Sequence, residues 1–129
     1  MMKKIEKTIP IQLEEIYNNT SIFISAEVSV EKGSLMKLNI VNVEDDILYH
    51  ATEEPIDLKV TNKGSKLRGK KLVITSRYNV IAPTEGEPIF PKVTWKPNLE
   101  AGDHTLYDDA QEESSDDNMF EFRLIFEIK

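Results

Sequence analysis

The chain contains no cysteine, so disulfides, thiolate metal sites and cysteine nucleophiles are all excluded. Small secreted domains often depend on disulfides, and their absence favours a reducing compartment. No apolar run approaches the ~20 residues that a helix needs to cross a bilayer. The first residues, Met1–Lys4, are charged like the start of a signal peptide, but Glu6 and Lys7 interrupt the apolar segment that should follow. We therefore expect a cytoplasmic protein with no membrane partner, although export without a leader would leave the same sequence.

Patterns typical of helices are nearly absent. Residues 12–17 have room for one helical turn, and no longer stretch repeats its apolar residues every 3.6 positions. With 129 residues the chain fits one domain, residues 1–129, which can bury about two-thirds of the surface that its unfolded form exposes. Its 40% content of hydrophobic residues is enough for one core.

Alternation of apolar and polar residues is the dominant pattern instead. In Phe120–Ile128, apolar side chains occupy every second position and charged residues fall between most of them. A period of two over this length predicts a strand with one buried face, on which Phe122, Leu124 and Phe126 are core residues. The segment Ile22–Val30 repeats the pattern.

The same alternation indicates further short strands at residues 5–13, 36–43, 56–60, 72–80, 89–95 and 104–107. Within 36–43 the phase slips after Ile40, which indicates a bulge. Turns rich in glycine, asparagine and proline separate the strands. Seven to eight short strands with regular turns predict an all-β fold, a single antiparallel β-sandwich.

The segment Leu99–Leu106, with the sequence LEAGDHTL, precedes a polar loop and the long final strand. It resembles the penultimate corner and last hairpin of immunoglobulin-like domains, over about thirty residues. His104 stands where those domains usually carry a corner tyrosine. The resemblance implies an immunoglobulin-like sandwich, with a jelly roll as the competing topology, and it implies nothing about activity.

Charge is sorted along the chain rather than mixed. Residues 58–84 contain seven basic side chains and no acid, whereas residues 97–122 contain nine acids and no Lys or Arg. Such blocks attract complementary surfaces, so they bear on partners more than on the fold. The predicted partner-binding residues are Lys59, Lys63, Lys66, Arg68, Lys70, Lys71, Asp108, Asp109, Glu112, Glu113, Asp116 and Asp117.

The acidic segment 108–118 has alternative interpretations. Carboxylates are ligands that calcium prefers, but the spacing of an EF-hand is absent. The composition is also typical of a mobile, solvated loop between two strands, and we predict no metal there. The basic segment does not indicate nucleic acid, because the pI is about 4.9 and no aromatic residue lies between Lys59 and Arg77.

Catalytic patterns are lacking. His50 and His104 are far apart in the sequence, and the strand hydroxyls, Ser25 among them, lack a nucleophile-elbow setting such as G-x-S-x-G. Trp95 shares its phase with Val93, which predicts burial in the core, whereas an exposed ring would form a platform for sugar stacking.

The sequence therefore favours a non-enzymatic protein-interaction or assembly module, without cofactor or metal. It would bind a protein partner, or a second copy of itself, through its sorted charges. A carbohydrate- or calcium-binding module and an acidic inhibitor that mimics nucleic acid are the alternatives.

Overall fold

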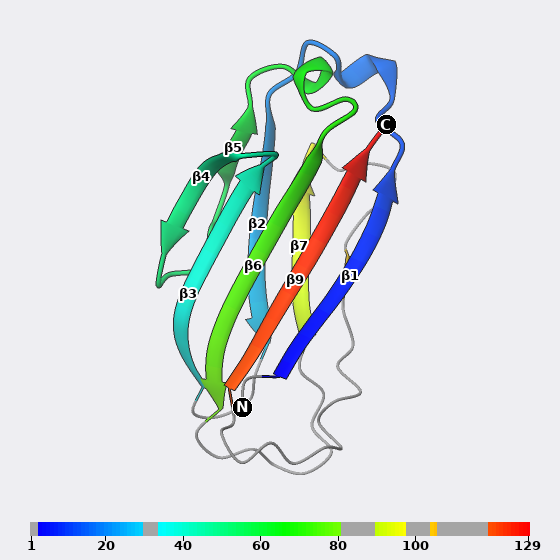
Figure 1. Cartoon of the computed structure of the whole chain (residues 1–129). Helices are drawn as coiled ribbons and strands as arrows, with labels where there is room; N and C mark the ends of the chain where they lie inside the picture. Colours follow the sequence, from blue (N-terminus) through cyan, green and yellow to red (C-terminus); the bar gives the residue numbers. More distant parts are fainter. Residues whose placement is uncertain (1–2, 30–33, 81–89, 98–103, 106–118) are drawn as a thin grey trace.

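The computed structural model describes residues 3–29, 34–80, 90–97, 104–105 and 119–129. These residues form nine strands and two short 3-10 turns, and the strand content confirms the all-β class (Figure 1). The strands are β1 (Lys3–Ile11), β2 (Ile22–Ser29), β3 (Ser34–Val43), β4 (Asp46–Ala51), β5 (Leu58–Thr61), β6 (Lys71–Val80), β7 (Phe90–Lys96), β8 (His104–Thr105) and β9 (Met119–Ile128). The turns are η1 (Glu15–Tyr17) and η2 (Gly64–Lys66).

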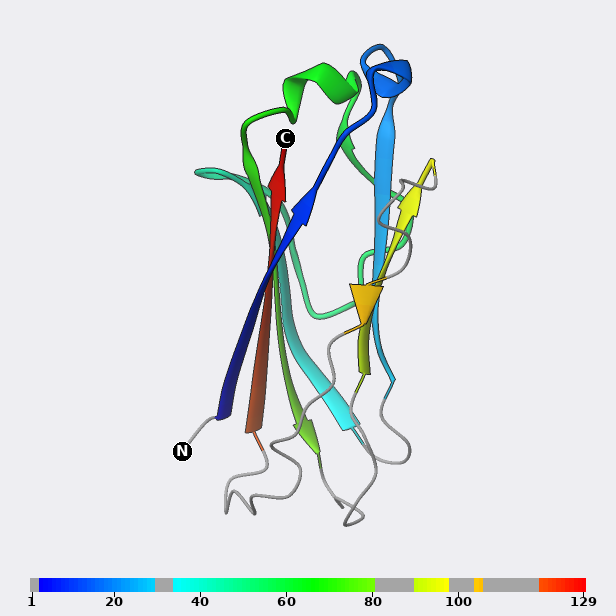
Figure 2. The ribbon, with the colours of Figure 1, turned by 90° about the vertical axis from the view of Figure 1, so that its right-hand side faces the viewer.

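The strands form two sheets that lie face to face (Figure 2). Sheet A has the order β1-β9-β6-β3-β4, and sheet B has the order β5-β2-β7-β8. Two features differ from the predicted antiparallel set of seven to eight strands: the described residues contain nine, and β1 pairs with β9 in parallel. Both strands run toward the end of the molecule that carries η1 and η2, where Leu13 and Ile11 continue the pairing with Lys129 through backbone hydrogen bonds of 2.8 Å.

The core lies between the two sheets and is built from the inward positions of the alternating segments. Phe122, Leu124 and Phe126 of β9 are buried, with 1%, 2% and 0% of their surface exposed, as predicted. Trp95 of β7 is buried as predicted, at 1% exposure. Its ring meets the ring of Phe126 edge to face, with centroids 5.1 Å apart, so this aromatic pair joins sheet B to sheet A.

The pairing of β3 is irregular at two places: its register with β4 shifts after Ile40, between Val41 and Asn42, and a second shift lies before Ile40. The pairing of β3 with β6 shifts between Met36 and Leu38. As a result, Leu38 and Ile40 are only half-buried, and the side chain of Asn39 is placed inside with Val41. Among the β3 side chains that the structure describes, the core face therefore includes a polar residue.

Ile56 does not join the strand that was predicted to contain it. Strand β5 begins at Leu58, and Ile56 is 78% exposed. The cause is Asp57, whose φ of 48° lies in the left-handed region and interrupts the extended chain just before β5. The segment 52–57 is consequently a connection that passes from β4 in sheet A to β5 in sheet B.

Candidate functional site

Four of the six predicted basic site residues gather at one end of the molecule. Lys63 and Lys66 lie at the two ends of η2, Lys70 follows it, and Lys71 begins β6. All four side chains are exposed. Gly64 of η2 packs against the backbone of Tyr17, where a Cβ would come within 2.2 Å of the Tyr17 carbonyl oxygen, so η2 is held tightly on η1. We call the surface formed by Lys63, Lys66, Lys70 and Lys71 the lysine end.

Arg68, another of the predicted basic residues, makes hydrogen bonds within the fold. Its guanidinium donates to the backbone oxygens of Leu13, at 2.7 Å, and Lys129, at 3.2 Å. It also donates to the side-chain oxygen of Asn18. Arg68 thus ties the segment after η2 to the segment after β1 and to the last residue of the chain. Lys59 stands apart from the lysine end, on β5, with its ammonium 5.8 Å from the centre of the Phe23 ring.

Acidic residues from elsewhere in the sequence adjoin the lysine end. Glu44, in the turn between β3 and β4, donates its N–H to the carbonyl of Lys71 at 2.9 Å, and its carboxylate accepts from the N–H of Lys71 at 2.9 Å. Asp45 follows in the same turn, and Asp46 is the first residue of β4. At this end of the molecule, basic residues therefore lie beside acidic residues that are separate from them in the sequence.

The acidic half of the predicted surface lies outside the described residues. This applies to all six predicted acids, Asp108, Asp109, Glu112, Glu113, Asp116 and Asp117. The strand that follows them, β9, begins at Met119 opposite Asn79, whereas Lys71 lies opposite Glu127 at the other end of the same pairing. The chain therefore enters β9 at the end of sheet A opposite the lysine end.

A groove lies on the outer side of sheet B, and sequence reasoning did not find it. Strands β2 and β7 form its floor, and the segment 52–57 forms one wall. Its volume is about 910 Å³, within the range of ligand- and peptide-sized sites. Phe23 and Ile56 supply apolar surface, and Thr94 is exposed within it.

The wall of the groove is held from both sheets. From sheet A, the Asn39 amide donates to the carbonyls of Thr52 and Glu53, and the Tyr49 hydroxyl donates to the same Glu53 carbonyl at 2.8 Å. From sheet B, the N–H of Ala26 donates to the carbonyl of Pro55 at 3.0 Å. A connection tied at this many points keeps one shape, so the groove is preformed.

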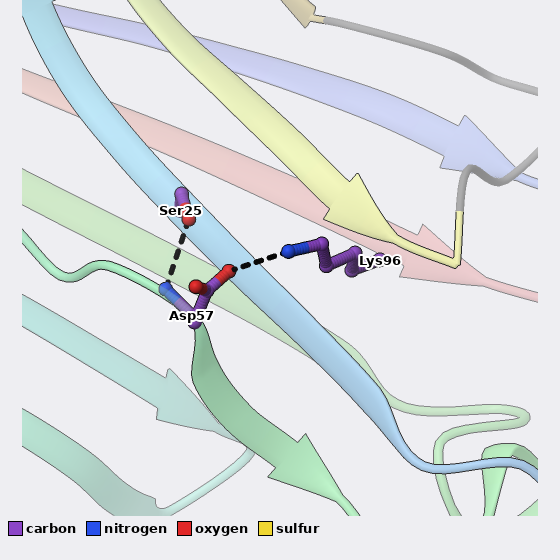
Figure 3. A network of polar contacts seen from close by, with 3 residues as sticks. All are labelled: Ser25, Asp57 and Lys96. Carbon is purple, nitrogen blue, oxygen red and sulfur yellow. Dashed lines mark hydrogen bonds and ion pairs between the residues drawn. The ribbon is translucent and has the colours of Figure 1, made fainter.

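Ser25, Asp57 and Lys96 form a polar network across β2 (Figure 3). The Asp57 N–H donates to the Ser25 hydroxyl at 2.9 Å, and the Lys96 ammonium lies 3.4 Å from the Asp57 carboxylate. The two ionic side chains are exposed, so the ion pair contributes little to stability. Its effect is to place one cation beside the acids of the groove.

The groove is acidic as a whole. Its lining carries four carboxylates, those of Glu27, Glu53, Glu54 and Asp57, and one ammonium, that of Lys96. Lys92 lies opposite Glu27 in the pairing of β2 with β7, at the edge of this surface. Because the acids come from β2 and from the 52–57 connection, no local run of charge in the sequence pointed to them.

The two histidines considered from the sequence lie in different sheets. His50 lies on β4 of sheet A and His104 on β8 of sheet B. Among the residues that the structure describes, no group of three or more His, Asp or Glu side chains is arranged to hold a metal ion. Within the same ranges, no helix is long and apolar enough to cross a membrane.

Asp57 offers a test of the backbone that shapes the groove. Replacing Asp57 by Val should lower the free energy of unfolding by about 1–2 kcal/mol, because a β-branched residue is strained at a left-handed φ. Replacing Asp57 by Gly is the matched control and should change it by less than about 1 kcal/mol, since only an exposed ion pair is lost. Urea denaturation of both variants measures the difference. Equal costs would show that the left-handed backbone is not the determinant.

Comparison with known proteins yields no match among protein-family models, curated proteins or solved structures.

Proposed function

We propose that the protein is a non-enzymatic interaction or assembly module that uses oppositely charged surfaces to bind a protein partner or a second copy of itself. One observation carries the proposal: an exposed lysine end and an acidic groove occupy different parts of the same molecule. Complementary surfaces at different places on one chain favour a head-to-tail contact, which is heterologous and can propagate into rings or filaments.

Two acidic parts of the chain are candidates for contact with the lysine end of a second molecule. One is the groove, with Glu27 and Glu53 exposed. The other is the acidic sequence 108–117, which the chain joins to β9 at the end opposite η2. A lysine end that meets either surface on a second molecule would form the same kind of electrostatic contact, so the experiment must separate the two.

The alternatives from the sequence have less support. A carbohydrate module would need an exposed aromatic platform, and Trp95 is 1% exposed. The acidic segment considered for calcium binding, residues 108–118, lies outside the described residues, and mimicry of nucleic acid was not assigned to particular acids. An interaction module is therefore the function that the described surface supports best.

We also propose an immunoglobulin-like arrangement of the two sheets. In immunoglobulin constant domains, strands C, F and G form one sheet, and B and E are neighbours in the other. The adjacent strands β3, β6 and β9 support an equivalence to C, F and G, and the pair β2 and β7 supports one to B and E. The chain order departs from that family in one respect, because β7 follows β6, whereas strand E precedes strand F.

The proposed assembly is tested by sedimentation velocity at low and high salt. We expect concentration-dependent association at low salt that weakens as the salt concentration rises, because the Debye length, over which charges act on one another, falls to about 3 Å at 1 M salt. Reversing Lys66, Lys70 and Lys71 to Glu should abolish the association. The free energy of unfolding should fall by no more than about 1 kcal/mol, because all three side chains are exposed and only position 71 lies beside acids, Glu44 and Glu127. A monomer at every concentration in low salt would exclude self-assembly.

A charge-swap experiment identifies the acidic surface. Glu27→Lys with Glu53→Lys reverses the groove, and Asp116→Lys with Asp117→Lys reverses part of the acidic sequence. Each double variant is mixed with the lysine-reversed triple variant at low salt. Restored association with only one of the two double variants assigns the contact to that surface. If neither mixture associates while the unmodified protein does, the charge pairing proposed here is wrong.

A further inference from the structure

The two most exposed of the large apolar side chains in the described residues are both isoleucines. Ile16 is 72% exposed and Ile56 is 78% exposed. They lie on the two oppositely charged surfaces: Ile16 is on η1, beside the lysine end, and Ile56 is on the wall of the acidic groove. An exposed apolar side chain surrounded by charge is typical of protein–protein interfaces, in which the buried centre is apolar and the rim is polar.

Ile16 is held next to the lysines by the packing of η1 on η2. The N–H of Gly64 donates to the Thr20 carbonyl at 3.0 Å, which joins the segment after Ile16 to the turn that Lys63 and Lys66 flank. Both lysine side chains are exposed. This end of the molecule therefore presents an apolar side chain together with ammonium groups.

The groove carries the complementary combination. Its apolar surface comes from Phe23 on the floor and Ile56 on the wall. Glu27 and Glu53 are exposed within it, and in the described ranges the structure pairs neither carboxylate with a cation. An apolar side chain with ammonium groups beside it therefore matches this groove in both polarity and charge.

We propose that the lysine end of one molecule docks in the groove of a second copy, with Ile16 seated against Phe23 and Ile56. The inference rests on the proposed function and names the groove as the acidic surface that the lysine end meets. The other candidate, residues 108–117, supplies charge but contains no apolar side chain larger than that of Ala110. It therefore has nothing comparable with which to cover Ile16.

The acid next to Ile16 also has a partner in this contact. Glu15, the acidic residue of η1, is exposed. In the groove, the Lys96 side chain is 73% exposed, and its ammonium lies 3.4 Å from the carboxylate of Asp57 in an exposed ion pair. An exposed pair of this kind is weak, so the ammonium is available to Glu15 of the second molecule as well.

Substitution of either isoleucine tests the contact. Ile16→Gln and Ile56→Gln each remove the apolar side chain without adding a charge, and both positions are exposed, so the fold should be unaffected. Each should raise the dissociation constant of the low-salt association at least about tenfold, because an isoleucine buried in the contact is lost. Ile47→Gln is the matched control: Ile47 is 65% exposed on β4, outside both surfaces, and this variant should associate like the unmodified protein.

A mixture of the two variants identifies which surfaces meet. The contact is heterologous, so each variant loses one of its two surfaces and keeps the other. The Ile16→Gln protein retains its groove, and the Ile56→Gln protein retains its lysine end. At a concentration where each variant alone is monomeric in sedimentation velocity, an equimolar mixture should form a one-to-one dimer and no larger species.

The outcomes separate this inference from the proposed function. Two weakened variants whose mixture forms the dimer support the inference. If the unmodified protein associates but Ile16→Gln or Ile56→Gln associates equally well, if Ile47→Gln is weakened as much, or if the mixture stays monomeric, docking in the groove is wrong and a charge contact elsewhere remains. A monomeric unmodified protein overturns self-association and this inference together. Far-UV circular dichroism and the urea midpoint of every variant confirm that the fold is intact.

Discussion

Replacing Phe126 by Ala is expected to lower the free energy of unfolding by about 3–5 kcal/mol, a large part of the stability of a typical small domain. The Phe126 ring is fully buried between the sheets and packs edge to face against Trp95. Its removal takes apolar surface out of the core and leaves a cavity that strands from two sheets cannot easily close. Phe122→Ala should cost a similar amount, because that ring is 1% exposed on the same face of β9.

Ile125→Ala is the matched control for these two variants. Ile125 lies on the same strand but at an outward position, where it is half-buried. Its truncation removes less buried surface, so the cost should stay at about 1 kcal/mol. Urea midpoints, with slopes compared to check that the unfolding transition is unchanged, measure all three. A cost for Phe126→Ala no larger than that for Ile125→Ala would contradict the assignment of the two faces.

Replacing Asn39 by Asp is expected to lower the free energy of unfolding by about 3–5 kcal/mol at neutral pH, although the two side chains have nearly the same shape. Asn39 is 1% exposed, and every polar group of its amide has a partner. Its amide nitrogen donates to the carbonyls of Thr52 and Glu53, and its oxygen accepts from the Ser76 hydroxyl at 2.8 Å. A carboxylate at this position cannot donate to the two carbonyls and would be a buried charge without a cation.

The pH dependence identifies the mechanism of this effect. Protonation gives the introduced carboxyl group a donor again and removes its charge, so the destabilisation relative to the unmodified protein should shrink as the pH falls. Asn42→Asp is the matched control, since Asn42 lies on the same strand and its amide donates only to the Glu44 carbonyl, at an exposed position. It should cost about 1 kcal/mol. A cost for Asn39→Asp that is small, or unchanged at acidic pH, would exclude the buried hydrogen-bond network as the anchor of the groove wall.

The fold class and the buried face of several strands were determined by the sequence alone. In β2 and β9, apolar residues at every second position match a geometry in which successive side chains point to opposite sides of the sheet, so the pattern identified the core face without any tertiary information. The burial of Trp95 followed from its phase with Val93 in the same way. Such predictions succeed because they depend only on residues that are near in sequence.

The partner of each strand and the surfaces that strands form together were decided by the tertiary structure. Asn39 was placed in the core by a shift in the pairing of β3 with β6, and Ile56 was left outside β5 by the left-handed backbone of Asp57. The alternation of apolar and polar residues in the sequence predicts neither the burial of Asn39 nor the exposure of Ile56.

The charged residues show most clearly what the sequence determined and what only the tertiary structure decided. The sequence showed a basic run, but only the fold revealed that Arg68 holds three backbone segments together while Lys63, Lys66 and Lys70 remain exposed. Glu27 and Glu53 line the same groove, although they are far apart along the chain. Composition sets the charges that a chain carries, and long-range strand pairing decides which of them share a surface, because that pairing joins segments whose separation in sequence has no local signal.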